Sequence, residues 1–379
     1  MRVAIDTSIL DQDPQRKRAE FKALARLASA GEISIYIPDV VRKEFLSHQM
    51  EWCCERLERL HGAAKALSKR RLPKELEDAC AALDGQHDSN RTAIDGMVSQ
   101  EFDEWLQSIG GTVVPIGPHH SGAVVASYFQ GSSPFKRVKE RDGFPDAFIV
   151  EAMRDVLIAN GALHVVVADK MIRDAFVSVP GVFCYGSLKE FLVSPACQPL
   201  LKPHYAATNF AKLIGLLSTQ RARFAQAIQS NIADELRYMT VDWPEQESGE
   251  VHLVWDFEPS ADVIEFFDHD AEFYGDGVFV LPFSILDHCI VSYPLFKSDY
   301  WIMDDEDIAS ISVTELNEHY YDAEQEVPVH VAGQLAVEID GMKLATGDLE
   351  EKEIVALLAR SKCALDSITD LRVEQSDAA

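Results

Sequence analysis

Four acidic residues occupy positions where carboxylates could gather around a divalent metal ion. Asp6 and Asp169 each follow a short apolar run typical of a buried strand, whereas Glu44 and Asp146 fall in the first turns of expected helices. Mg²⁺ and Mn²⁺ prefer hard oxygen ligands, and a bound ion of this kind activates water and stabilises charge on a phosphate. Because crowded carboxylates repel one another, such a group is costly unless a cation compensates. A pocket of three or four acids from different elements is what metal-dependent phosphodiester hydrolysis requires.

The elements expected around these acids alternate between strands and helices. Apolar runs typical of buried strands are separated by periodic stretches typical of helices, and the strands are expected at residues 2–6, 33–37, 112–116, 163–168 and 182–185. This alternation predicts an α/β domain with a mostly parallel sheet, whose ligands bind beyond the carboxyl ends of the strands. Asp146 is placed to cap a helix over residues 147–160. The acids should therefore meet at one edge of the sheet.

The character of the chain changes near residue 200. Residues 196–206 lie in a proline-rich stretch without periodicity, which indicates a linker. After a helical segment from Asn209 to Met239, short runs rich in aromatic and β-branched residues, at 277–283 and 288–293 among others, predict an antiparallel sheet, and Asp340-Gly341 predicts a hairpin turn. The expected organisation is an α/β domain over residues 1–195 and an acidic α+β domain of unassigned role over residues 207–379.

The net charge of −27 over 379 residues is unevenly distributed. Residues 1–200 hold 24 Lys and Arg against 27 Asp and Glu, whereas residues 201–379 hold 11 against 35. A strongly acidic protein is a poor partner for phosphate, yet nearly all of this excess lies in the second half. The first half carries two basic clusters that could contact a phosphate backbone, Lys65 to Arg71 and Lys136 to Arg141. A solvated helix face is an equal alternative for the first of them.

Cysteine usage and hydropathy indicate a cytoplasmic protein. The seven cysteines are scattered and never spaced as Cys-x-x-Cys, which argues against both a disulfide framework and a structural zinc site. No run approaches the roughly 20 consecutive apolar residues that a membrane span needs, and the N-terminus begins with a strand-like run in place of a signal sequence. We therefore expect reduced thiols, no membrane partner and a cytoplasmic location.

Four short motifs resemble, in order, those of the PIN-domain nuclease family. They are Val3-Ala-Ile-Asp6-Thr7-Ser8, Pro38-Asp-Val-Val-Arg-Lys-Glu44-Phe, Gly143-Phe-Pro-Asp146-Ala-Phe-Ile and Val165-Val-Val-Ala-Asp169-Lys170. Each motif alone is weak, but their order, spacing and expected elements agree. The resemblance covers roughly residues 1–192, and the long insertion between the second and third motifs is most similar to the larger bacterial PIN-like proteins.

The resemblance implies a metal-dependent nuclease with a PIN-like, Rossmann-type parallel sheet flanked by helices. Asp6, Asp146 and Asp169 would be the main ligands of Mg²⁺ or Mn²⁺, directly or through water, with Glu44 as the fourth acid. The implied partner is nucleic acid, with single-stranded RNA favoured over DNA. Taken singly, each acid also has a plain interpretation as a helix cap or an exposed loop residue.

Some neighbouring residues have both a functional and an ordinary interpretation. Thr7 or Ser8 would position water or the first carboxylate. The pair His119-His120 lacks a further spaced ligand, so a surface loop is the favoured interpretation. Lys170 is equally a phosphate contact or a surface lysine.

Two other enzyme classes fit the opening strand less well. A haloacid-dehalogenase-like phosphatase needs a second Asp two positions after the first, where this chain has Ser8, and a dinucleotide-binding domain needs a Gly-x-Gly-x-x-Gly turn that does not follow the first strand. The serious rival is a non-catalytic PIN-fold module that binds nucleic acid or protein and is regulated by the acidic domain. Retention of all four acids favours catalysis.

The acidic half admits two interpretations. The stretch from Trp301 to Asp307 could compete with nucleic acid for the basic clusters and so restrain the nuclease. The ordinary alternative, which we favour, is a domain that binds a protein partner or forms a homodimer, because acidic surfaces often serve only solubility.

Overall fold

The chain folds into two compact units, Met1–Cys197 and Gln198–Ala379. A computed structural model describes residues 1–379 except 86, 202–203, 238, 244–250, 254–256 and 375–379. We call residues 1–197 the α/β unit and residues 198–379 the acidic unit. In the part of the chain that the structure describes, no helix combines the length and the apolar character needed to cross a membrane.

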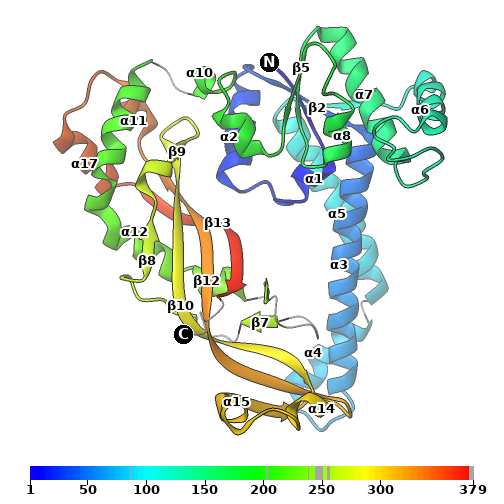
Figure 1. Cartoon of the computed structure of the whole chain (residues 1–379), viewed down its shortest axis with the longest axis vertical. Coiled ribbons are helices and arrows are strands. Elements are labelled where there is room, and N and C mark those ends of the chain that lie inside the picture. The colour runs from blue at the N-terminus through cyan, green and yellow to red at the C-terminus, as the bar shows by residue number, and fades with distance from the viewer. Residues whose placement is uncertain (86, 202–203, 238, 244–250, 254–256, 375–379) are drawn as a thin grey trace. The chain divides into compact units, whose positions relative to one another are not determined.

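The α/β unit is built on a five-stranded parallel sheet (Figure 1). In spatial order its strands are β3 (Thr112–Val114), β2 (Ser34–Pro38), β1 (Arg2–Ile5), β4 (Leu163–Val166) and β5 (Val182–Tyr185). All four pairings are parallel. The sequence winds outward from β1 in both directions, so the crevice between β1 and β4 is a topological switch point, where α/β sheets commonly bind ligands.

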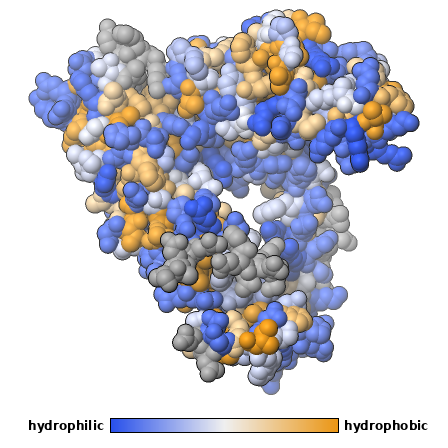
Figure 2. All heavy atoms as spheres, viewed as in Figure 1, coloured by the Kyte–Doolittle hydropathy of each residue, from blue (hydrophilic) through white to orange (hydrophobic). Residues whose placement is uncertain are grey.

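Helices flank this sheet, which confirms the predicted α/β class of the first half. They are α1 (Thr7–Leu10), α2 (Ala19–Ser29), α3 (Asp39–Leu67), α4 (Lys74–Gly85), α5 (His87–Ser108), α6 (Pro118–Gln130), α7 (Phe144–Asn160), α8 (Lys170–Asp174) and α9 (Leu188–Val193). The two longest, α3 and α5, run side by side (Figure 1). The surface over α3 is mostly hydrophilic (Figure 2), as expected for a long helix that projects from the sheet.

A buried arginine fastens the loop after α1 to these two long helices. Arg16 is only 7% exposed and pairs with Glu101 at 3.1 Å. Its guanidinium carbon lies 5.1 to 5.7 Å from the centroids of three aromatic rings, those of Phe45, Phe102 and Trp105. Because a buried cation is tolerated only when it is paired or stacked, this contact has one well-defined geometry. It holds the base of α3, the helix that carries one of the four acids.

The acidic unit has the predicted α+β class with an antiparallel sheet of eight strands. Its main path is β11 (Ile311–Glu315), β12 (Tyr320–Glu338), β10 (Val278–Phe296), β7 (Val251–Leu253) and β6 (Thr240–Val241). Beside this path, β13 (Lys362–Val373) pairs with β12, whereas β8 (Ile264–Phe266) and β9 (Glu272–Phe273) pair with β10. All of these ladders are antiparallel.

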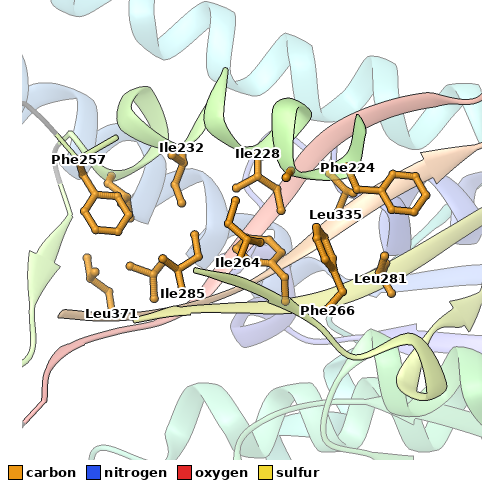
Figure 3. Close-up of a cluster of buried hydrophobic side chains, with 14 of the residues drawn as sticks. Phe224, Ile228, Ile232, Phe257, Ile264, Phe266, Leu281, Ile285, Leu335 and Leu371 are labelled. Carbon is orange, nitrogen blue, oxygen red and sulfur yellow. The ribbon is translucent and has the colours of Figure 1, made fainter. Parts of the chain in front are cut away.

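Helices cover part of this second sheet and close its core. They are α10 (Gln198–Leu201), α11 (His204–Leu216), α12 (Arg221–Gln229), α13 (Ile232–Leu236), α14 (Lys297–Tyr300), α15 (Asp305–Ser310), α16 (Gly341–Ala345) and α17 (Glu351–Ala359). Side chains of α12 and α13 point toward apolar side chains on the strands (Figure 3), and both sets are buried: Phe224, Ile228 and Ile232 on the helices, with Ile264, Phe266, Leu281, Ile285 and Leu335 on the strands. This apolar layer supplies the main stabilisation of the unit.

The central ribbon of the acidic unit differs from the sequence-based expectation. The two short strands expected at 277–283 and 288–293 are one 19-residue strand, β10, which pairs with β12 along its whole length. The pair Asp340-Gly341 does not form a hairpin, because the Asp340 side chain accepts from Lys343 N at 3.2 Å and caps α16. Gly341 is needed for close approach, since a Cβ there would lie 2.3 Å from the carbonyl carbon of Asp276.

The segment expected as a linker, residues 196–206, contains regular structure. It includes α10 and the first residues of α11, while residues 202–203 lie outside the described ranges. The division between the compact units falls within this segment, after Cys197.

Candidate active site

Asp6 lies at the carboxyl end of β1 and is only 3% exposed. Its backbone N–H donates to the carbonyl of Val166 in β4 at 3.1 Å. Its Oδ2 accepts hydrogen bonds from Ser8 N at 3.1 Å and from Ser8 Oγ at 2.6 Å, and the same hydroxyl accepts from Ala168 N at 3.0 Å. Asp6 therefore caps α1, and Ser8 holds its carboxylate against the neighbouring strand end.

Glu44 is the sixth residue of α3 and is half-buried. Its Oε2 accepts a hydrogen bond from Thr7 Oγ1 at 2.8 Å, which joins the start of α3 to the end of β1. Burial raises the pKa of Glu44, and the charges of Asp6 and Asp11 raise it further, whereas the Thr7 hydroxyl and His48 oppose the shift. The Glu44 carboxylate is thus held in place by the Thr7 hydroxyl and is influenced by the charges of neighbouring acids.

Asp146 is the third residue of α7, so it does not cap this helix as the sequence predicted. The helix begins at Phe144, and Gly143 occupies the cap position without a side-chain hydrogen bond. The early start follows from Pro145, which fits the first turn because its fixed φ is helical and no backbone N–H is needed there. Asp146 is half-buried and is not committed to the cap.

Asp169 follows β4 and caps α8. Its Oδ1 accepts from Met171 N at 2.6 Å and from Ile172 N at 3.2 Å. The residue is exposed, as the plain interpretation of a capping loop acid also requires.

The four acids are electrostatic neighbours. Burial is the largest cause that raises the pKa of Asp146, to about 6, and the charges of Asp169, Asp6 and Glu44 add to the shift, while Lys136 opposes it. The pKa of Asp6 is also raised, first by burial and in addition by Asp169. Such carboxylates gain a favourable partner when a cation binds nearby. A donor set made only of carboxylate oxygens fits Mg²⁺ or Mn²⁺ better than a soft metal.

The spacing of the acids is wider than a compact cage around one ion. Over the described ranges, the three metal-ligand atoms that lie within 4.8 Å of one another come instead from His119, His120 and Asp155. The four acids therefore affect one another's pKa, but among these described residues no three carboxylates have oxygen atoms within 4.8 Å of one another.

The histidine pair lies in a helix, α6, and joins it to α7, so the loop interpretation was wrong, although His119 is exposed as that interpretation expected. His120 lies in the first turn of α6 and has no exposed surface. Gly117 N donates to His120 Nδ1 at 3.1 Å, so Nε2 carries the proton that is donated to Asp155 Oδ2 at 2.8 Å. His119 Nε2 lies 3.0 Å from the same carboxylate oxygen. A histidine that binds a metal ion offers the lone pair of one ring nitrogen to the ion and donates the proton of the other. In His120 the nitrogen that faces Asp155 carries the proton and the other nitrogen already accepts from Gly117, so neither lone pair is available to an ion.

A fifth acid borders the group and was not singled out from the sequence. Asp11 Oδ2 lies 2.8 Å from His48 Nδ1, and its Oδ1 is buried with no hydrogen-bond partner among the described residues. A buried orphan oxygen is an atom that a cation or an ordered water would satisfy. Its position five residues after Asp6 was the available signal.

Comparison with known proteins identifies the fold of this region. Residues 3–169 match a family model described as the PIN domain, a span that begins in β1 and ends at Asp169. No curated protein and no solved structure shows a significant match to the chain. PIN domains are generally metal-dependent nucleases that act on nucleic acids. Because the matched span carries both the parallel sheet and the four acids, the α/β unit of this chain belongs to the PIN-domain family.

Proposed function

We propose that this protein is a divalent-metal-dependent nuclease that hydrolyses phosphodiester bonds, with single-stranded RNA preferred over DNA. Asp6, Glu44, Asp146 and Asp169 would hold Mg²⁺ or Mn²⁺. The observation that carries the proposal is the raised pKa of three of these carboxylates, to which their mutual repulsion contributes, within a PIN domain. Crowded acids of this kind are typical of functional sites, because a cation removes the cost of gathering them. The RNA preference rests on the family resemblance.

The residues of the chain would prepare the site before substrate arrives. Ser8 and Thr7 fix the carboxylates of Asp6 and Glu44 through their hydroxyls, so little reorganisation is needed when an ion binds. A bound divalent ion supplies an activated water and stabilises charge on the phosphate. Burial of Asp6 keeps competing water from its carboxylate and strengthens its attraction for a cation.

The rival function is a PIN-fold module that binds nucleic acid without cleaving it. Two observations favour it: the acids do not close around one point, and Asp6 and Asp169 already serve as helix caps. The two functions differ in whether bound nucleic acid is hydrolysed and whether the acids are needed for that step.

Cleavage by the full chain separates these functions. We would incubate it with single-stranded RNA and DNA of one sequence, in Mg²⁺, Mn²⁺ or a chelator, beside Asp146→Asn and Asp142→Asn. Asp142 is a matched control because it is an exposed acid in the turn just before α7. We expect metal-dependent cleavage that Asp146→Asn lowers by at least about 100-fold and that Asp142→Asn leaves unchanged. Binding without cleavage, or full activity of Asp146→Asn, would overturn the proposal.

A further inference from the structure

The loop between α6 and α7, residues 131–143, carries a concentrated positive charge beside the acids. Four of its side chains are cations and all are exposed: Lys136, Arg137, Lys139 and Arg141. No carboxylate lies within ion-pair distance of any of them among the residues that the structure describes. Unpaired cations beside a group of acids need an explanation, because an ion pair between them would be the simplest arrangement.

The loop is anchored at the starts of the two helices that carry Asp146 and Asp169. Ser133 Oγ donates to the carbonyl oxygen of Met171 at 2.7 Å, in the turn that Asp169 caps. The buried ring of Phe135 lies 5.5 Å from the ring of Phe144, at the first residue of α7. Lys136 follows Phe135 directly, so it lies next to the anchors of both helices.

The backbone of the loop is held in one conformation. Lys136 N donates to Glu140 Oε2 at 2.6 Å, so that carboxylate is committed to the backbone. Lys139 N donates to the carbonyl oxygen of Tyr128 at 3.0 Å although its φ of +61° is unfavourable for a side-chain-bearing residue. The surrounding contacts thus hold a strained turn whose cations are exposed, with Lys139 Nζ 6.0 Å from the centroid of the Phe129 ring.

We propose that this loop is the phosphate-binding edge of the site and that Lys136 contacts the phosphate of a single strand bound at the acids. This inference rests on the proposed nuclease function, since it assigns the substrate's charged backbone to the loop. Acids without a bound metal ion would repel a phosphodiester strand, so a cation beside them would favour binding near neutral pH. The other three cations would contact phosphates farther along the strand.

The test uses the full chain with Lys136→Gln, Lys136→Arg and the control Lys362→Gln. Lys362 is likewise exposed and has no ion pair among the described residues, but it lies in the acidic unit, at the first residue of β13, outside both basic clusters. Binding of a short labelled single strand would be measured in chelator over a salt series, and steady-state KM and kcat in Mn²⁺.

We expect Lys136→Gln to weaken binding and raise KM by about fivefold with little change in kcat, and to lower the slope of log affinity against log salt by about 0.7. Lys136→Arg should restore both values and Lys362→Gln should change neither. An unchanged salt slope in Lys136→Gln, or an equal loss in Lys362→Gln, would overturn the inference. Failure of the proposed function is distinct from this, because it would show as binding without cleavage in the wild-type chain.

Discussion

The two units of this chain use acidic residues in opposite ways. Residues 201–379 hold 35 Asp and Glu against 11 Lys and Arg, yet hydrogen bonds lower the pKa of Asp262 and of Glu315 there, and both residues are exposed. Residues 1–200 are nearly neutral, yet this half contains Asp6, Glu44 and Asp146, whose pKa values are raised mainly by burial. The number of acids in a region therefore does not indicate where a functional site lies, whereas burial and mutual repulsion of the acids do.

The same distinction operates inside the α/β unit. Burial opposes ionisation of Asp155, but hydrogen bonds from His120 and His119 outweigh it and lower the pKa of this carboxyl. Asp155 has its partners and joins α6 to α7. The pKa of Asp146, on the same helix, is instead raised by burial and by the charges of Asp169, Asp6 and Glu44. A paired acid has a structural explanation, whereas crowded acids call for a cation.

The largest expected effect is on catalysis, and it tests whether the buried acids of the α/β unit differ in function from the exposed acids of the acidic unit. Asp6→Asn should lower metal-dependent cleavage on the order of 1,000-fold, because it removes a buried anionic oxygen worth several kcal/mol of charge stabilisation. Asn still caps helices well, so the fold should remain intact, which a thermal melt would verify. Asp262→Asn in the acidic unit is the control and should cleave at the wild-type rate. Similar rates for both variants would mean that crowding does not mark the site.

The next effect concerns whether the α/β unit and the acidic unit unfold independently of each other. Ile228→Ala should lower the unfolding free energy of the acidic unit by about 3 kcal/mol, since this side chain is fully buried in the layer between α12 and the sheet. Calorimetry of the full chain should show one transition shifted and the transition of the α/β unit unmoved. Ile302→Ala, at a residue that is 83% exposed in the same unit, should shift neither. Equal shifts of both transitions would show that the chain unfolds as one body.

The parts of the fold that the sequence could predict depend on local patterns. The continuous apolar runs of β1 and β4 indicated strands buried on both faces, and a parallel sheet then required Asp6 and Asp169 to share one edge. The start of α7 was misplaced by three residues, because Gly143 and Pro145 read equally well as a breaker cluster and as the opening of a helix.

The parts that could not be predicted depend on partners far along the chain. Asp287 and His288 interrupt the apolar pattern of β10, and only the continuous pairing with β12 carries the strand through them. Likewise, nothing local distinguishes a buried His120 from a surface histidine, because its partner Asp155 lies 35 residues later. The four acids do not close to ligand distance around one point, which no motif could have indicated.

A smaller effect should appear in stability against pH without metal. The pKa of Asp146 in the folded chain is about 6, above the ordinary 3.8, so the fold favours its protonated form. Its contribution to stability is therefore complete below about pH 4 and is lost as pH rises through 6. Asp146→Asn cannot ionise, so in chelator its stability relative to wild type should increase between pH 4 and pH 7, by about 1 kcal/mol after allowing for solvent screening. Thermal melts would measure this.

The exposed acid Asp142 provides the control for that experiment. Asp142→Asn removes an acid at an exposed position in the turn just before α7. If the stability of Asp146→Asn relative to wild type changed with pH no more than that of Asp142→Asn, the carboxyl of Asp146 would not be an electrostatic member of the group.

The smallest expected effect tests whether the acidic unit restrains the nuclease. Near its exposed Trp301 and Ile302, 73% and 83% exposed, lie Asp299, Asp304 and Asp307. Replacing all three acids with Asn should change cleavage by less than about twofold at 0.1 M salt, because interactions between exposed charges are strongly screened at this salt concentration. A gain of activity at low salt that disappears at high salt would instead indicate competition with nucleic acid for the basic clusters. The exposed acids of the acidic unit would then affect cleavage through their charge. The number of acids, and not only their burial and mutual repulsion, would in that case matter for function.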